Sequence, residues 1–212
     1  MKAAYKKAYL FAAILSMILY LLGIYTGILL QKNVEASIER RLKEIEKNIE
    51  NTQLEYLYIS NFGEKIPCNS LKMMVDETNK RLWDIGKELE KLESNESKFM
   101  ETKKQYMLLS VRAWMLNVYL KERCKDDSLI LLYFYSIPCD DCIKQGKILD
   151  DVRDNIFKER MKVFVLDAGL GLPIIDTIKK SYNVTTTPFI VFENKTFSGL
   201  TSKEEIIGAL SD

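Results

Sequence analysis

Two cysteines separated by two residues are the part of the sequence best suited to chemistry. Cys139 and Cys142 lie in the segment 136–142, SIPCDDC, directly after the apolar run 129–135 and directly before a helical pattern. At a helix start, two thiols at this spacing lie about one turn apart and can close a disulfide. The first can be a thiolate, stabilised by unpaired backbone N–H groups and the helix dipole. The spacing alone is weakly specific, because zinc and haem sites use it too.

The elements that must hold these cysteines in place are readable from the sequence. The run 129–135 is apolar throughout, which is typical of a strand buried on both faces. Asn194-Lys195 separates two β-rich runs and predicts a tight hairpin. Pro173 suits the first position of a helix, and Ser202 with Glu205 forms a capping box. We predict strands over 129–135, 161–166, 189–193 and 196–200, and helices over 139–157, 172–182 and 202–210.

The segment 129–212, with its CxxC and with Thr186-Thr187-Pro188 about 45 residues later, resembles the thioredoxin/glutaredoxin superfamily. The resemblance covers about 40% of the chain. It implies an α/β fold with a four-stranded mixed sheet flanked by helices, without the extra N-terminal strand of thioredoxin itself.

The resemblance also implies a substrate-binding loop beside the two cysteines. In that family the matching proline is cis and its loop lies against the CxxC, which carries over to Pro188 with Thr187 in front. A cis proline exposes the preceding backbone groups, which can pair with an extended substrate strand. Gly199 matches the family's glycine that leaves room for a substrate near the disulfide. Thr187, Pro188 and Gly199 are therefore the expected substrate-binding residues.

The sequence departs from the family at the groups that handle protons. The buried acid that many members carry six residues before the first cysteine is Tyr133 here. The chain contains no histidine, so no imidazole can acidify Cys139. Dithiol–disulfide chemistry is therefore expected without the family's usual internal proton acceptor.

Two acids between the cysteines, Asp140 and Asp141, bear on the direction of electron flow. Negative charge beside a thiolate raises the pKa of the thiol, which favours the disulfide form and lowers the reduction potential. This reasoning favours a reductase or isomerase-like poise over a strong oxidase. The competing interpretation is that both are solvated acids that only stabilise the start of the helix.

Composition excludes some classes of partner. The 212 residues carry 31 basic and 30 acidic side chains, and no basic stripe with interleaved aromatics occurs. A nucleic-acid partner is therefore not expected. No cofactor and no metal are predicted.

An apolar run without charge over residues 8–30 predicts a transmembrane helix, within an anchor over 1–31. Its length suits a hydrocarbon core of about 30 Å. A cleavable signal peptide is the competing interpretation. The counts of basic residues on the two sides nearly tie, but a short basic tail before the first apolar segment usually stays inside. We expect a single-pass membrane protein whose body is extracytoplasmic.

Residues 32–126 are predicted to form an α-helical stalk and hairpin, before a thioredoxin-like domain over 127–212. Apolar residues at alternating threes and fours predict an amphipathic, coiled-coil-like helix that continues to about residue 60. Helices over 70–92 and 97–121 follow, separated by Glu93-Ser94-Asn95-Glu96. The sequence leaves open whether the chain forms a homo-oligomer through this region.

Cys68 and Cys124 each lie 28 positions from Glu96, so a hairpin folded there places them level. A structural disulfide between them would close a loop of more than 50 residues and stabilise the fold by about 4 kcal/mol. Two buried free thiols, or a second redox pair that exchanges with Cys139 and Cys142, are the alternatives. A four-cysteine zinc site is disfavoured, because the paired ligand spacing is missing.

Two functions follow from these patterns. The first is a membrane-anchored thiol–disulfide oxidoreductase in which Cys139 attacks a disulfide and Cys142 resolves the mixed disulfide. Its expected partners are protein clients with disulfides or dithiols, and a redox partner protein. The second is a non-enzymatic, membrane-tethered coiled-coil scaffold whose thioredoxin-like domain is redox-inactive.

Overall fold

The computed structural model describes residues 15–25, 54, 57–59, 61–92 and 97–211. Residues 15–25 are helical and fall within the predicted anchor. The rest of that anchor and most of the predicted amphipathic helix lie outside the described residues. Among the residues that are described, no helix combines the length and the apolar character needed to cross a membrane.

Residues Glu64–Asp212 form one compact unit. A short 3₁₀ turn (Gly63–Lys65) lies at its start, and a π-helical turn (Arg153–Phe157) and a second 3₁₀ turn (Lys158–Arg160) lie directly before its second strand. Its helices are α2 (Cys68–Lys91), α3 (Ser97–Cys124), α4 (Asp140–Val152), α5 (Pro173–Ser181) and α6 (Lys203–Ser211). Its strands are β1 (Leu129–Tyr135), β2 (Met161–Asp167), β3 (Phe189–Phe192) and β4 (Lys195–Ser198). The predicted helix over 139–157 was too long, because its regular α-helix ends at Val152.

The four strands form a single mixed sheet with the order β2-β1-β3-β4. β1 pairs in parallel with β2 and antiparallel with β3, and β3 pairs antiparallel with β4. The predicted four-stranded mixed sheet is therefore confirmed. β1 is an inner strand, which explains why its residues are apolar at consecutive positions.

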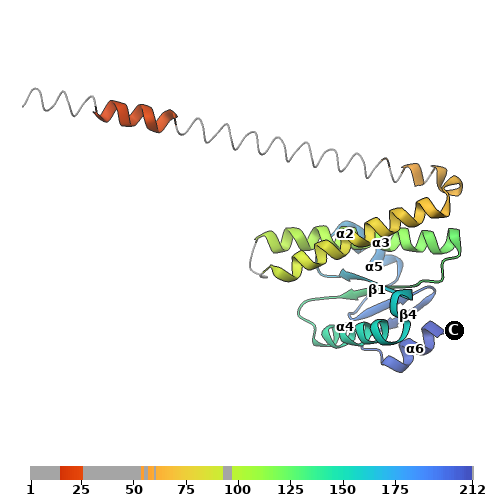
Figure 1. The fold of residues 1–212 in the computed structure, drawn as a ribbon. Coiled ribbons are helices and arrows are strands. Elements are labelled where there is room, and N and C mark those ends of the chain that lie inside the picture. Colours follow the sequence, from red (N-terminus) through yellow and green to blue (C-terminus); the bar gives the residue numbers. More distant parts are fainter. Residues whose placement is uncertain (1–14, 26–53, 55–56, 60, 93–96, 212) are drawn as a thin grey trace, which may run out of the picture. The chain divides into compact units, whose positions relative to one another are not determined.

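The helices cover both faces of this sheet, as Figure 1 shows. Alternate residues of β1 supply the two cores, because successive side chains of a strand point to opposite faces. Ile130, Leu132 and Phe134 pack with α3 and α5. Leu129, Leu131 and Tyr133 pack with α4 and α6. A strand in this position cannot shift by one residue without exchanging its two cores.

α2 and α3 form an antiparallel hairpin, and α3 lies directly on the sheet. Its Met107 and Val111 join the core of that face, and Ser110 Oγ donates a hydrogen bond to the Val165 carbonyl at 3.0 Å. Lys103 forms a buried ion pair with Asp167, the last residue of β2. Such a pair tolerates no loss of one partner, since the other charge would stay buried alone. The predicted helical hairpin is thus present, while the division into domains at residue 127 stays a prediction.

Candidate functional site

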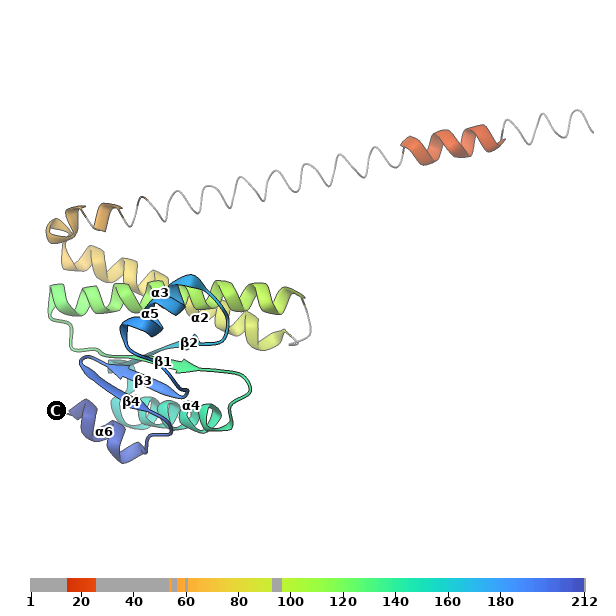
Figure 2. The ribbon, with the colours of Figure 1, turned by 180° about the vertical axis from the view of Figure 1, so that it is seen from behind.

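The site lies where β1 ends and α4 begins. Residues 136–139 connect the two elements, and Figure 2 shows this connection at the end of β1 that is opposite to the junction with α3. The Ile137–Pro138 peptide bond in this loop is cis, which the sequence analysis did not anticipate. Because β1 is buried on both faces, its end is held in place. The loop that follows it therefore places Cys139 at the start of α4.

Cys139 and Cys142 are joined in a disulfide. Cys139 is the N-cap of α4, and its Sγ accepts a hydrogen bond from the backbone N–H of Cys142 at 3.0 Å. This is the contact that would stabilise a thiolate at this position after reduction. Cys139 is half-buried, whereas Cys142 is only 5% exposed. The sulfur of Cys139 is therefore the more accessible of the two.

The loop before β3 lies against the disulfide. The Thr187–Pro188 bond is cis, and the Thr187 carbonyl oxygen lies 3.9 Å from Cys139 Sγ. Gly199 donates its backbone N–H to the Pro188 carbonyl at 2.9 Å, and its φ of +82° is a conformation that glycine adopts without strain. The structure thus brings Thr187, Pro188 and Gly199 to the same edge of the sheet as the two cysteines.

Ser136 belongs to this site and was missed by the sequence analysis. Its hydroxyl lies 2.6 Å from the hydroxyl of Thr187, so it ties the loop after β1 to the loop before β3. The contact extends the antiparallel register, in which Phe134 pairs with Phe189. Two positions further from that pair, residues 136 and 187 face each other. A prediction of this register would have found the contact.

Gln145 is a second residue that the sequence analysis missed. It lies on α4, is fully buried, and accepts a hydrogen bond from the Thr201 backbone N–H at its Oε1, at 2.7 Å. This bond fastens the loop that carries Gly199 to the helix that carries Cys142. No motif in the sequence marks a buried glutamine, because the side chain has neither a special spacing nor a charge.

Tyr133 occupies the interior beneath the second cysteine. It is buried, and its hydroxyl donates a hydrogen bond to the Cys142 carbonyl at 2.7 Å. Burial raises the pKa of Tyr133 to about 12, so the phenol is neutral near pH 7. It can orient the first turn of α4 but cannot accept a proton from Cys142 as a carboxylate would.

The surface around the disulfide mixes apolar and acidic side chains. Ile137, Ile143 and Leu200 are exposed large hydrophobic residues on the loops and on α4. Asp141 is paired with Lys144 at 2.8 Å, and this hydrogen bond raises the pKa of Lys144.

The second cysteine pair is also bonded, since Cys68 and Cys124 form a disulfide with a Cα–Cα distance of 5.8 Å. Cys68 is exposed and Cys124 is partly exposed, so these are not buried thiols. The bond lies where α3 leads into β1, whereas the other disulfide follows the far end of that strand. Seven residues of strand span roughly 23 Å, so the two pairs cannot exchange directly within one chain.

A zinc site made from the four cysteines is excluded by this separation. Within the part of the chain that the structure describes, no group of three or more His, Cys, Asp or Glu residues could hold a metal ion.

No protein-family model matches the sequence, and no curated protein matches it. Among solved structures, thioredoxin-2, a component of the malaria parasite protein secretion machinery, is 18% identical, with a TM-score of 0.35 over 40% of this chain and 82% of its own. The thioredoxin Mala s 13 of Malassezia sympodialis is 15% identical, with a TM-score of 0.35 over 44% and 82%. The Drosophila melanogaster thioredoxin Deadhead is 18% identical, with a TM-score of 0.34 over 46% and 91%. At these values the thioredoxin-like fold of residues 129–212 is best judged from the chain's own strand order and register.

The raised pKa of Tyr133 predicts a specific loss of stability in alkali. Between pH 10 and about 12 the phenol ionises in the unfolded chain while it stays protonated in the folded one. The unfolded state then binds fewer protons, so the unfolding free energy falls as the pH rises, by up to about 1.4 kcal/mol per pH unit. Tyr133→Phe should lower the unfolding free energy by about 1 kcal/mol at pH 7, because the hydrogen bond is lost. This difference in unfolding free energy between the variant and the unaltered chain should disappear above pH 10.

Denaturant unfolding of Tyr133→Phe and of the unaltered protein at pH 7, 10 and 11 measures this difference in unfolding free energy. Tyr119→Phe, which removes a partly exposed phenol on α3, is the matched control. A gap between Tyr133→Phe and the unaltered chain that stays constant up to pH 11 would contradict the prediction.

Proposed function

We propose that the protein is a thiol–disulfide oxidoreductase that acts on protein disulfides through Cys139 and Cys142. The observation that carries the proposal is the pairing of an accessible sulfur at a helix start with a shielded one behind it, beside the Thr187–Pro188 loop. The Cys139 sulfur is accessible to the disulfide of another molecule, and the Cys142 sulfur is placed behind it to resolve the mixed disulfide.

The reaction begins from the reduced pair. The Cys139 thiolate attacks a substrate disulfide, one substrate sulfur leaves as a thiolate, and a mixed disulfide with Cys139 remains. Cys142, after loss of its proton to water, attacks Cys139 Sγ and expels the second substrate thiolate. The protein ends as the Cys139–Cys142 disulfide, and the substrate has gained two electrons and, after protonation, two thiols. The Cys142 N–H, 3.0 Å from Cys139 Sγ, stabilises the attacking thiolate.

The substrate is held by the loops around the disulfide. The Thr187 backbone lies beside Cys139, and the backbone N–H of Gly199 donates a hydrogen bond to the Pro188 carbonyl. Exposed Ile137 and Leu200 offer apolar contacts to the residues that flank a substrate cysteine. The partners that fit are protein clients with accessible disulfides, and a donor protein that returns electrons to the pair. The alternative, a scaffold with a static disulfide, would be supported by failure of the test below.

The proposed poise is that of a reductase or isomerase. Asp140 and Asp141 lie in the first turn of α4, where negative charge opposes a thiolate at Cys139 and favours the disulfide form. Asp141 is paired with exposed Lys144, so its effect is partly offset.

The two cysteines have different expected phenotypes. Cys139→Ser should abolish the catalysed reduction of insulin or client disulfides, because the attacking sulfur is gone. Cys142→Ser should accumulate mixed disulfides with clients, because the resolving sulfur is gone. Turbidity with insulin and non-reducing electrophoresis measure the two effects, and Cys68→Ser/Cys124→Ser is the control that should keep activity. If neither single substitution alters reduction, Cys139 and Cys142 are not the catalytic pair.

Removing the acids of the first turn should shift the redox equilibrium. Asp140→Asn/Asp141→Asn is expected to raise the reduction potential of the pair by roughly 10–30 mV, because two charges that disfavour the thiolate are lost. Equilibration with glutathione, followed by alkylation, measures this potential. Asp150→Asn/Asp151→Asn, in the last turn of α4, is the matched control. No difference between the two double variants would show that Asp140 and Asp141 are only solvated acids.

The proposal retains a membrane-anchored location with the body of the protein outside the cytoplasm. It is supported by the uncharged apolar run over residues 8–30 and by the short basic tail before it. A reporter that is active only outside the cytoplasm, fused after Asp212, should be active. The same fusion lacking residues 1–31 should lose that activity, and activity of a cytoplasmic reporter in the full chain would reverse the orientation.

A further inference from the structure

The side-chain amide of Gln145 has an unused hydrogen-bond donor in the interior of the protein. Within the part of the chain that the structure describes, its Nε2 is the one buried side-chain nitrogen or oxygen without a hydrogen-bond partner. The residue is 0% exposed, so bulk solvent does not reach this nitrogen. Most buried polar groups are hydrogen-bonded, and an exception needs an explanation, such as a role in a reaction.

Thr201 determines which end of the amide carries this donor. The Thr201 backbone N–H requires an acceptor, and the Gln145 Oε1 accepts its hydrogen bond at 2.7 Å. The two N–H bonds of Nε2 are therefore at the opposite end of the amide group. Thr201 in turn follows Gly199, whose N–H is bonded to the Pro188 carbonyl. The amide is thus fixed in orientation by a loop that is itself held in place.

The helix α4 places this donor beside Cys142. Its buried residues are Cys142, Gln145, Leu149 and Val152, which recur at helical spacing and form one stripe that faces the sheet. Gln145 follows Cys142 by three positions, so the two are neighbours on adjacent turns. Long side chains on a helix lean toward its N-terminus and cover the preceding turn. The Gln145 amide therefore lies over the turn that carries Cys142.

The titratable groups on the elements around Cys142 do not supply a donor for its sulfur. Tyr133 of β1 donates its hydroxyl to the Cys142 carbonyl. The acidic pair 140–141 in the same turn of α4 opposes a negative charge, and Lys144 is exposed and paired with one of these acids. Lys203 of α6 is paired with an acid in the last turn of α4. A thiolate at a residue that is only 5% exposed therefore needs another donor.

We propose that Gln145 is a catalytic residue of the resolving step, whose Nε2 donates a hydrogen bond to Cys142 Sγ when this sulfur is a thiolate. This role rests on the function proposed above. In the mixed disulfide, Cys142 loses its proton to water and the amide stabilises the resulting charge. The thiolate then attacks Cys139 Sγ and forms the Cys139–Cys142 bond. The bond between Cys139 and the substrate sulfur breaks, and its electron pair leaves with the substrate thiolate. In the disulfide state the uncharged sulfur is a weak acceptor, which explains why the donor is unused there.

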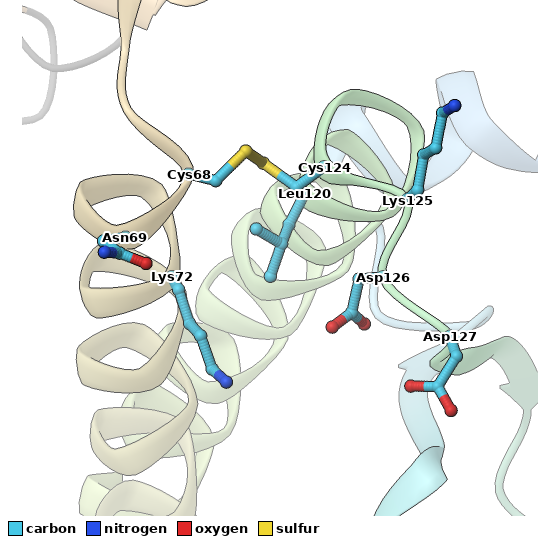
Figure 3. A pocket seen from close by; sticks show the side chains of 8 residues that line it. All are labelled: Cys68, Asn69, Lys72, Leu120, Cys124, Lys125, Asp126 and Asp127. Atoms are coloured by element: carbon cyan, nitrogen blue, oxygen red, sulfur yellow. A yellow bond between two sulfur atoms is a disulfide. The ribbon is translucent and has the colours of Figure 1, made fainter.

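The test follows the ionisation of Cys142 in a full-length Cys139→Ser chain, in which Cys142 is a free thiol. Cysteine Cβ atoms are labelled with ¹³C, and their chemical shifts are measured against pH by NMR. Cys68 and Cys124 stay joined at the end of the hairpin (Figure 3), so their signals serve as an internal reference that does not titrate. Gln145→Met should raise the midpoint of the Cys142 titration by about one pH unit, because a hydrogen bond to the charged sulfur is lost.

Two further variants separate the donor from the bond to Thr201 and from packing. Gln145→Glu keeps an oxygen for the Thr201 N–H but replaces the donor by a carboxylate, so the midpoint should rise at least as far as in Gln145→Met. Leu149→Met changes the same buried stripe without a polar group and should leave the midpoint unchanged. Circular dichroism verifies that each variant is folded.

The proposal is overturned if Gln145→Met leaves the midpoint unchanged, or if Leu149→Met raises it equally. It is also overturned if Gln145→Met raises the midpoint and Gln145→Glu does not, because the bond to Thr201 would then account for the effect.

The resolving step is measured in the chain that retains both cysteines. At pH 7 Gln145→Met should lengthen the lifetime of the mixed disulfide with insulin by a factor of about three. The thiolate fraction falls about tenfold, and the higher nucleophilicity of a more basic thiolate offsets part of this loss. Rapid acid quenching and mass spectrometry measure this lifetime, and an unchanged lifetime would overturn the proposal. A shifted midpoint in a protein that reduces no insulin would support the hydrogen bond and reject the proposed function.

Discussion

The burial of β1 on both faces is the constraint on which the rest of the structure depends. Its seven residues supply side chains to both cores and pair with β2 on one edge and β3 on the other. The strand has no freedom to slide, twist away or change register without losing apolar contacts on two sides. Whatever is attached to its ends is therefore held in place. At one end this is the loop that carries the Cys139–Cys142 disulfide, and at the other it is the junction with α3.

The chemistry of the site follows from what surrounds that fixed strand end. The loop after β1 and the loop before β3 are joined by hydroxyl groups of Ser136 and Thr187, and Gln145 joins α4 to the loop that carries Gly199. Neither of these two contacts involves a charge. Close approach of the Thr187 carbonyl to Cys139 is set by neutral hydrogen bonds, so this geometry is independent of pH over the range in which thiols ionise. Beneath the pair, a neutral phenol takes the place that a proton acceptor would need.

Most of residues 129–212 could be predicted because strong local patterns agree with one another. The unbroken apolar run of β1, Pro173 at a helix start and the CxxC each fix an element or a boundary, and the sheet that results is the expected one. The predicted hairpin between β3 and β4 is present, but its turn is Glu193-Asn194, one residue before the predicted Asn194-Lys195, because Phe192 pairs with Lys195. The pairing of Cys68 with Cys124 could also be predicted, because both lie equally far from Glu96 and a hairpin folded there places them level with each other. Equal spacing is informative here because both helices are regular.

What the sequence did not reveal depends on contacts between distant segments. Ser136 and Gln145 acquire their roles from residues more than 50 positions away, and neither position is unusual by composition. The ion pair of Lys103 with Asp167 is similar, because Lys103 belongs to a lysine-rich helix in which no pattern marks one lysine as buried. The exposure of Cys68 was also not predictable, because spacing can place two sulfurs together but cannot say what covers them.

The position of the Cys68–Cys124 bond has a mechanical consequence for a chain that is held at its N-terminal side. A pulling force that reaches Cys68 passes through the sulfur bridge to Cys124 and from there to the start of β1, from which only four residues separate it. The 55 residues between the bridged cysteines, which include most of the hairpin, carry none of this tension. Once the bridge is opened, the same load runs through the whole of α2 and α3. The redox state of one bond thus decides which helices resist extension.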